Sequence, residues 1–173
     1  KENYLQVLQK EKPDIIFLCN PNNPTGLLVE KTLLEKILKR CQELDILMAV
    51  DECFLDFVPT PEKYTLKEYL ETYDNLFLLK AFTKRYAMAG VRLGYGLCGN
   101  KKLLEKIEGV CQPWNVSSMA QAAGLAALQE REYVEKGRQV TFQELAYLKG
   151  ELAVLGYPVY SSQANYVFFT GPA

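Results

Sequence analysis

The chain has 173 residues, of which 49% are hydrophobic and 24% charged, and its formal net charge is -1, a composition typical of a globular protein with a sizeable core. It has no basic cluster that would indicate nucleic-acid binding, no apolar run long enough to cross a bilayer and no signal-peptide pattern, so we expect a cytoplasmic protein. Because histidine is absent and none of the five cysteines forms a C-x-x-C pair, His-dependent triads and metal sites are not expected.

The first half of the chain is predicted to alternate apolar strands with helices. A polar helix is predicted over residues 1–13, followed by a strand over residues 15–19. Residues 20–26 form a turn, because two X-Pro steps and a glycine enforce an extended, turning backbone. Further strands are predicted over residues 46–50 and 76–82. Between the first two strands lies an amphipathic helix, whose apolar positions share one face at helical spacing: Leu34, Ile37, Leu38 and Cys41.

The second half is predicted to be mainly helical. A fourth strand is expected over residues 93–98, where alternating glycines indicate close backbone packing. Asn100 is expected to cap the next helix, and Ser118 to open a long helical tract that continues to Leu155. A last strand is predicted over residues 165–169. The helices point these apolar residues inward: Leu103, Leu104 and Ile107 in the first, and Val140, Leu145, Leu148 and Leu152 in the long tract.

Three polar residues stand at the ends of successive predicted strands. They are Asn23, Asp51 and Lys84, which are 28 and then 33 residues apart, the length of a βαβ unit. Ligands bind α/β proteins in the crevice outside the carboxyl ends of the strands. Taken alone, Lys84 is more simply an ordinary solvated lysine, since a lysine becomes a nucleophile only when desolvation or neighbouring cations lower its pKa. A position in a cleft at the strand end, with Arg92 eight residues further on, would provide both conditions.

This constellation resembles the class I and II aminotransferase family, whose enzymes use pyridoxal 5'-phosphate and have the fold called type I. The resemblance rests on the run NPNNPTG at residues 20–26, the pattern DExFxxF at residues 51–57, and the lysine and arginine that follow. Phe54 and the segment at residues 112–116 are most like the branch that holds histidinol-phosphate aminotransferase and threonine-phosphate decarboxylase.

The resemblance implies a fold, a domain division and an assembly. The fold is α/β: part of the mainly parallel sheet, with flanking helices, of the large domain, plus the start of a smaller α+β C-terminal domain. Residues 1–115 would be the second half of the cofactor-binding domain, and residues 116–173 the connecting helix and the first part of the small domain. Because members of the family are about twice this long, we expect a partial chain, and a homodimer for the full-length protein.

The resemblance also implies a role for each site residue. Lys84 would hold the cofactor aldehyde as a Schiff base and then act as acid and base, while Asp51 would keep the pyridine nitrogen protonated. Asn23 would donate a hydrogen bond to the ring hydroxyl oxygen, and Arg92 would bind the cofactor phosphate. The substrate would be a small amino acid or amino-phosphate.

Two departures from the family pattern affect the expected function. Phe54 stands where most of these aminotransferases carry a tyrosine, and Ala81 stands where many carry a serine or threonine. Both remove a hydroxyl from the cofactor site, so weaker cofactor binding is expected from this segment alone, and Phe54 favours the decarboxylase over the histidinol-phosphate aminotransferase. A non-catalytic binding module with the same fold is the alternative from another class. The strand at residues 15–19 is expected to be an apolar edge that self-associates or is covered by the N-terminal helix.

Overall fold

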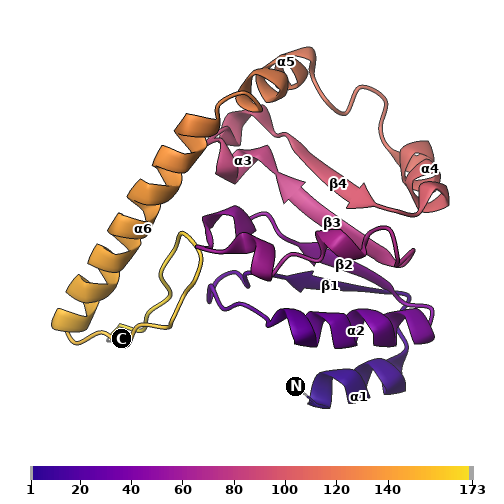
Figure 1. The fold of residues 1–173 in the computed structure, drawn as a ribbon, viewed down its shortest axis with the longest axis horizontal. Coiled ribbons are helices and arrows are strands. Elements are labelled where there is room, and N and C mark those ends of the chain that lie inside the picture. Colours follow the sequence, from indigo (N-terminus) through magenta and orange to yellow (C-terminus); the bar gives the residue numbers. More distant parts are fainter. Residues whose placement is uncertain (1, 172–173) are drawn as a thin grey trace.

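The sheet has four strands and lies at the centre of the structure, a computed structural model that describes residues 2–171. The strands are β1 (Ile15–Cys19), β2 (Leu47–Asp51), β3 (Leu76–Ala81) and β4 (Gly94–Cys98), in the spatial order β1-β2-β3-β4. The first three are parallel and β4 is antiparallel to β3 (Figure 1). The predicted α/β fold with a mainly parallel sheet is therefore confirmed.

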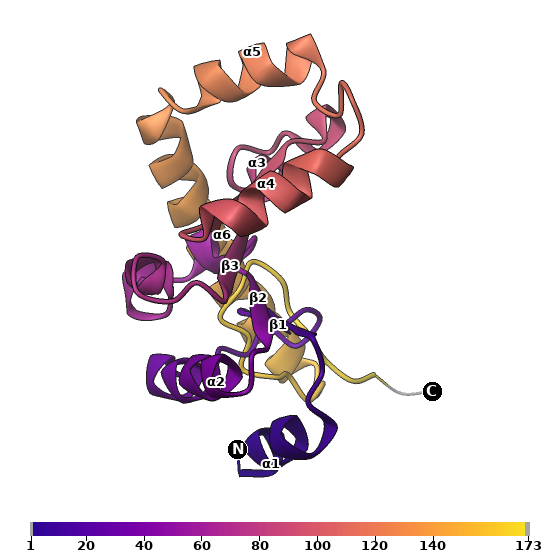
Figure 2. The same ribbon diagram turned by 90° about the vertical axis from the view of Figure 1, so that its right-hand side faces the viewer.

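Residues 2–171 also form six helices. Helix α2 contacts both α1 and β2, and Figure 2 shows α2 on one side of the sheet and the C-terminal segment on the other. No helix among residues 2–171 is long and apolar enough to cross a membrane. The helices are α1 (Glu2–Glu11), α2 (Lys31–Glu43), α3 (Phe82–Arg85), α4 (Lys101–Val110), α5 (Ser118–Ala127) and α6 (Arg131–Val154), with 3₁₀ turns at Leu55–Phe57, Pro61–Lys63, Lys67–Tyr69 and Ala89–Val91.

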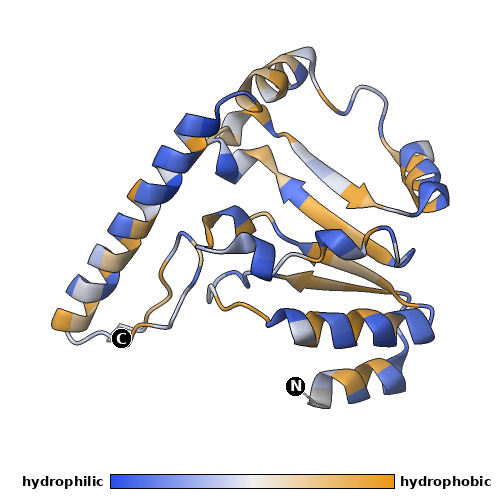
Figure 3. Cartoon of the chain, in the orientation of Figure 1, coloured by the Kyte–Doolittle hydropathy of each residue, from blue (hydrophilic) through white to orange (hydrophobic). Residues whose placement is uncertain are grey.

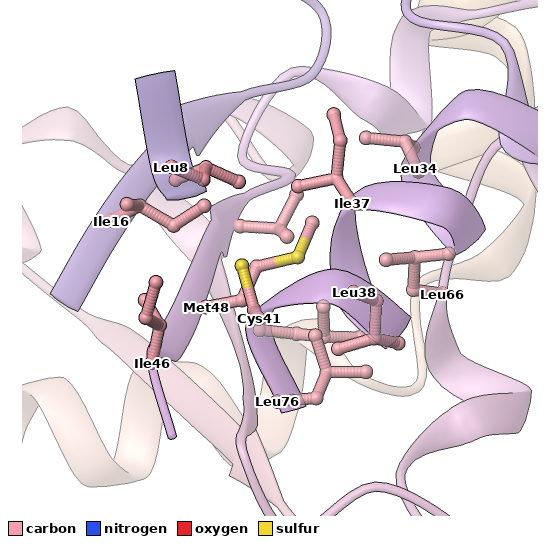
Figure 4. Packing of buried hydrophobic residues seen from close by; sticks show 12 residues of the cluster. Leu8, Ile16, Leu34, Ile37, Leu38, Cys41, Ile46, Met48, Leu66 and Leu76 are labelled. Carbon is pink, nitrogen blue, oxygen red and sulfur yellow. The ribbon is translucent and has the colours of Figure 1, made fainter. Parts of the chain in front are cut away.

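The core lies between α2 and the sheet. All four apolar residues predicted for the inner face of α2 are buried, and Figure 4 shows them packed with side chains from the strands. Met48 pairs with Leu76 and Val50 pairs with Leu78 in the sheet register, so these side chains face α2 together. Burial of a side chain of this size contributes about 1.5–3 kcal/mol.

Two parts of the helical prediction were wrong. The tract from Ser118 to Leu155 is broken at residues 128–130, where the backbone of Glu130 leaves helical geometry (φ -85°, ψ 57°). Helix α5 then contacts the turn at Ala89–Val91, and α6 contacts the turn at Leu55–Phe57. Along α6, Leu145 and Leu152 are partly buried but Val140 and Leu148 are exposed. In Figure 3, hydrophobic and hydrophilic residues alternate along α6. The packed face of α6 instead carries Val134 and polar side chains, which heptad spacing does not reveal.

Local prediction succeeded at one helix cap and was less accurate elsewhere. Asn100 Oδ1 accepts a hydrogen bond from Leu103 N at 3.1 Å, which confirms the predicted cap. The cap of α5 is Ser117, one residue before the predicted one. In α4, Leu103 and Ile107 are partly buried as predicted, whereas Leu104 is exposed.

The predicted strand at residues 165–169 does not form; residues 159 and 169 make an isolated bridge. The C-terminal segment instead bonds to the loop after β1, where Gln163 N donates to Gly26 O at 2.8 Å. On the exposed edge of the sheet, Leu8 from α1 joins the core beside Ile16, while Phe17 remains 66% exposed. The N-terminal helix therefore covers one face of β1, and self-association through this edge stays a prediction.

Two side chains attach α6 to the rest of the chain. Near its start, Arg138 Nη2 donates to Val58 O at 3.1 Å. Near its end, Lys149 Nζ donates to Ser162 O at 2.5 Å, and burial lowers the pKa of this lysine. The C-terminal segment is thus tied both to α6 and to the loop after β1.

Candidate active site

The four residues predicted for the site lie at one edge of the sheet. Asn23 follows β1, Asp51 ends β2, and Lys84 lies in α3, which begins directly after β3. These strands are parallel, so their carboxyl ends meet at the same edge. Arg92 precedes β4, and because β4 runs antiparallel, its start lies at that edge too. The topology therefore brings all four to the crevice where α/β proteins bind ligands.

Asp51 points away from α2, because side chains alternate along a strand and the preceding Val50 faces the core. Its Oδ1 accepts a hydrogen bond from Cys53 N at 2.9 Å. Burial, followed by a hydrogen bond to Asp51, raises the pKa of the Cys53 thiol to about 12. Burial and then the Asp51 charge also raise the pKa of Cys19, the partner of Asp51 in the sheet register. The Asp51 carboxylate thus lies on the face of the sheet opposite the core.

Lys84 is exposed, and its ammonium nitrogen lies 5.2 Å from the centre of the Phe54 ring. The desolvation expected for this lysine is therefore not provided by the described residues. It also borders a pocket of about 140 Å³ between α3 and α6. Asp56, Arg85 and Arg138 line the same pocket, and Arg85 Nη1 pairs with Asp56 Oδ1 at 2.5 Å.

Arg92 and Asn23 are both exposed and sit in tight turns. Arg92 has left-handed backbone geometry (φ 56°), and its Nη1 donates to Ala89 O at 3.1 Å. Asn23 lies in a loop closed by two backbone hydrogen bonds, from Asn22 N to Leu27 O at 2.8 Å and from Gly26 N to Asn22 O at 2.6 Å. Gly26 needs to be glycine, because its φ is +70° and a Cβ there would lie 1.9 Å from the Oγ of Ser162.

Sequence reasoning missed a buried ion pair behind the site. Glu52 is fully buried and pairs with Lys80 Nζ at 2.8 Å; its carboxylate also accepts from Thr65 Oγ1 at 2.9 Å and Leu66 N at 3.1 Å. Glu52 continues the face of Val50, and Lys80 continues the face of Leu78. Each of the two residues follows a core residue by two positions, and these core residues are paired on neighbouring strands. This spacing was a signal in the sequence that could have revealed the ion pair.

The second missed residue is Tyr166, which was predicted only as part of a strand. Its hydroxyl donates to Asn22 O at 2.8 Å, and its ring meets the edge of Phe54 at a centroid distance of 5.1 Å. No local pattern in the sequence indicates this contact, which joins residues 144 positions apart. Among the described residues, no cluster of three or more His, Cys, Asp or Glu side chains could hold a metal ion.

Known proteins resemble the chain throughout its length. Residues 2–173 match the family model for aminotransferase class I and II. A protein of Caldanaerobacter subterraneus subsp. tengcongensis, assigned as a threonine-phosphate decarboxylase, is 34% identical over 167 residues, which are 95% of this chain and 45% of that protein. Histidinol-phosphate aminotransferases of several other bacteria are 32% to 37% identical to this chain. The chain thus spans less than half the length of these relatives.

Solved structures match the fold equally well. The histidinol-phosphate aminotransferase of Clostridium acetobutylicum superposes with a TM-score of 0.88 at 31% identity, over 96% of this chain and 51% of that one. The enzyme of the same name from Sinorhizobium meliloti, solved in complex with pyridoxal 5'-phosphate, gives a TM-score of 0.82 at 25% identity, over 96% of this chain and 44% of that one. With a family model that covers residues 2–173 and a shared fold, this chain belongs to the class I and II aminotransferases, a family that binds pyridoxal 5'-phosphate.

Proposed function

We propose that the protein is a pyridoxal-phosphate-dependent enzyme that acts on a small amino-acid or amino-phosphate substrate, as an aminotransferase of the histidinol-phosphate type. The observation that carries the proposal is the meeting of Asn23, Asp51, Lys84 and Arg92 at one sheet edge in a chain of this family. The names of most of the similar proteins support the aminotransferase over the decarboxylase that Phe54 favoured.

The donor set fits the cofactor chemically. A carboxylate, an amine, an amide and a guanidinium match in turn a pyridinium nitrogen, an aldehyde, a ring oxygen and a phosphate. When bound, the cofactor supplies an electron-withdrawing ring that stabilises negative charge at the α-carbon of the substrate.

Each side chain then has a distinct task. Asp51 keeps a proton on the pyridine nitrogen, and Cys53 holds the Asp51 carboxylate in place through its backbone N–H. Lys84 would hold the cofactor at its aldehyde and would move a proton at the substrate α-carbon. Asn23 would donate to the ring oxygen, and Arg92 would bind the phosphate. Phe54 contributes no hydroxyl, so ring binding depends more heavily on Asn23.

Threonine-phosphate decarboxylation is the second candidate. It is favoured by Phe54 and by the relative from Caldanaerobacter. The two reactions are distinguished by their products: the full-length protein incubated with histidinol phosphate and a 2-oxo acid should consume both without releasing carbon dioxide. Release of carbon dioxide from threonine phosphate would replace the aminotransferase with the decarboxylase. The homodimer and the domain division at residue 116 stay predictions that accompany either activity.

The Schiff-base lysine provides the test of the cofactor proposal. Pyridoxal phosphate added to the full-length protein should give a visible absorbance band, and borohydride should attach the cofactor to Lys84. Lys84→Ala should abolish both, whereas Lys36→Ala, a change at an exposed lysine of α2, should alter neither. A protein that gives no band, or that keeps it in Lys84→Ala, would be the non-catalytic module or would use another lysine.

A further inference from the structure

The C-terminal segment at residues 160–166 crosses the loop that carries Asn23. Figure 1 shows this yellow stretch returning from α6 to the region beyond the end of β1. Three contacts fix it there: Gln163 N donates to Gly26 O, Ser162 leaves no room for a Cβ at Gly26, and Tyr166 Oη donates to Asn22 O. The segment is therefore packed on this loop through several independent contacts.

Tyr166 also adjoins other residues of the site. Its ring packs edge-on against Phe54, with an interplanar angle of 86°, and the Lys84 ammonium lies over that same Phe54 ring. Burial, then the nearby Cys19 and Asp51, raise the pKa of Tyr166 to about 12. The hydroxyl therefore keeps its proton, and can donate it in a hydrogen bond, throughout the neutral range.

The acceptor of this hydrogen bond determines what Tyr166 controls. The carbonyl of Asn22 belongs to the peptide unit that joins Asn22 to Asn23, so whatever fixes this oxygen fixes the backbone from which the Asn23 side chain extends. The oxygen accepts from Gly26 N at 2.6 Å inside the loop and from Tyr166 Oη at 2.8 Å outside it. The second donor ties the orientation of the loop to the C-terminal segment.

We propose that Tyr166 is a positioning residue that orients Asn23 toward the ring oxygen of pyridoxal phosphate through its hydrogen bond to the Asn22 carbonyl. The inference rests on the proposed function and assigns to the C-terminal segment a role in the cofactor site. Position 54 is a phenylalanine, and Tyr166 acts on the cofactor ring through Asn23 rather than by direct contact.

The test uses the full-length protein titrated with pyridoxal phosphate. Tyr166→Phe keeps the ring on Phe54 and removes only the hydroxyl, so it should weaken cofactor binding roughly 3- to 10-fold, the usual effect of one hydrogen bond. It should also shift the pH midpoint of the bound cofactor's visible absorbance in the same direction as Asn23→Ala. Tyr160→Phe is the matched control, because Tyr160 lies in the same segment and its hydroxyl has no hydrogen bond among the described residues.

The double variant separates positioning from general stabilisation. In an Asn23→Ala background, Tyr166→Phe should cause no further shift of the absorbance midpoint, because its effect passes through Asn23. Hydrogen exchange without cofactor should show faster exchange at the Gly26 amide in Tyr166→Phe. A midpoint shift that persists without Asn23, or a Tyr166→Phe protein that binds and titrates like wild type, would overturn this role alone. Wild-type protein that binds no cofactor would overturn the proposed function itself.

Discussion

Removal of the Lys80 ammonium should be among the most damaging changes in the sheet, although Lys80 is not a site residue. Glu52 has no exposed surface, and the Lys80 side chain is only 14% exposed. Lys80→Met keeps most of the packing volume but leaves the carboxylate with two uncharged donors, Thr65 Oγ1 and Leu66 N. Breaking a buried pair by removing one partner costs about 3–5 kcal/mol. Because those two donors remain, we expect the lower end, about 3 kcal/mol.

Urea unfolding of the full-length protein, monitored by circular dichroism, measures the loss of unfolding free energy in Lys80→Met. Removing both charges with Glu52→Gln and Lys80→Met should recover most of it, since no buried charge is then left unpaired. Lys10→Met is the matched control, because the Lys10–Glu11 pair is largely exposed and such pairs contribute about 0–1 kcal/mol. A Lys80→Met loss below about 1 kcal/mol, or a double variant less stable than the single one, would refute the buried-pair reasoning.

Two further predictions concern the loop and the thiols. In a thermal melt, Gly26→Ala should lower the stability of the protein by about 1 kcal/mol or more, because φ at this position is +70° and the new Cβ meets Ser162. The control Gly150→Ala, in open space on α6, should be neutral or stabilising. Equal effects of the two substitutions would contradict the argument. Cys53 should resist a thiol reagent at pH 8 while exposed Cys111 reacts, because burial raises the pKa of Cys53 to about 12 and leaves roughly one thiolate in ten thousand. Mass spectrometry of the labelled chain compares the labelling of Cys53 and Cys111, and equal labelling of the two thiols in folded protein would contradict the prediction.

The sequence was most informative where local and tertiary requirements coincide. The strands through β4 and the buried face of α2 were predictable, because the same apolar residues define the element and its packing. The strand-end positions of Asn23, Asp51 and Lys84 followed from these elements. Heptad spacing misplaced the packed face of α6, because that face uses Arg138 and Lys149 to reach backbone carbonyls. Tyr166 was beyond prediction, since its partner is set by how the chain returns over the sheet.

The two attachments of α6 couple the angle of this helix to the position of the C-terminal segment. Its 24 residues extend about 36 Å at 1.5 Å per residue, and Arg138 fixes it near one end. A tilt of about 5° around Arg138 would move Lys149, 11 residues further along the helix, by about 1.4 Å. Lys149 holds Ser162, so the C-terminal segment would move with the helix. A displacement of that size along the 2.8 Å hydrogen bond between Tyr166 and Asn22 would break it, so we expect the angle of α6 and the order of the Asn23 loop to change together.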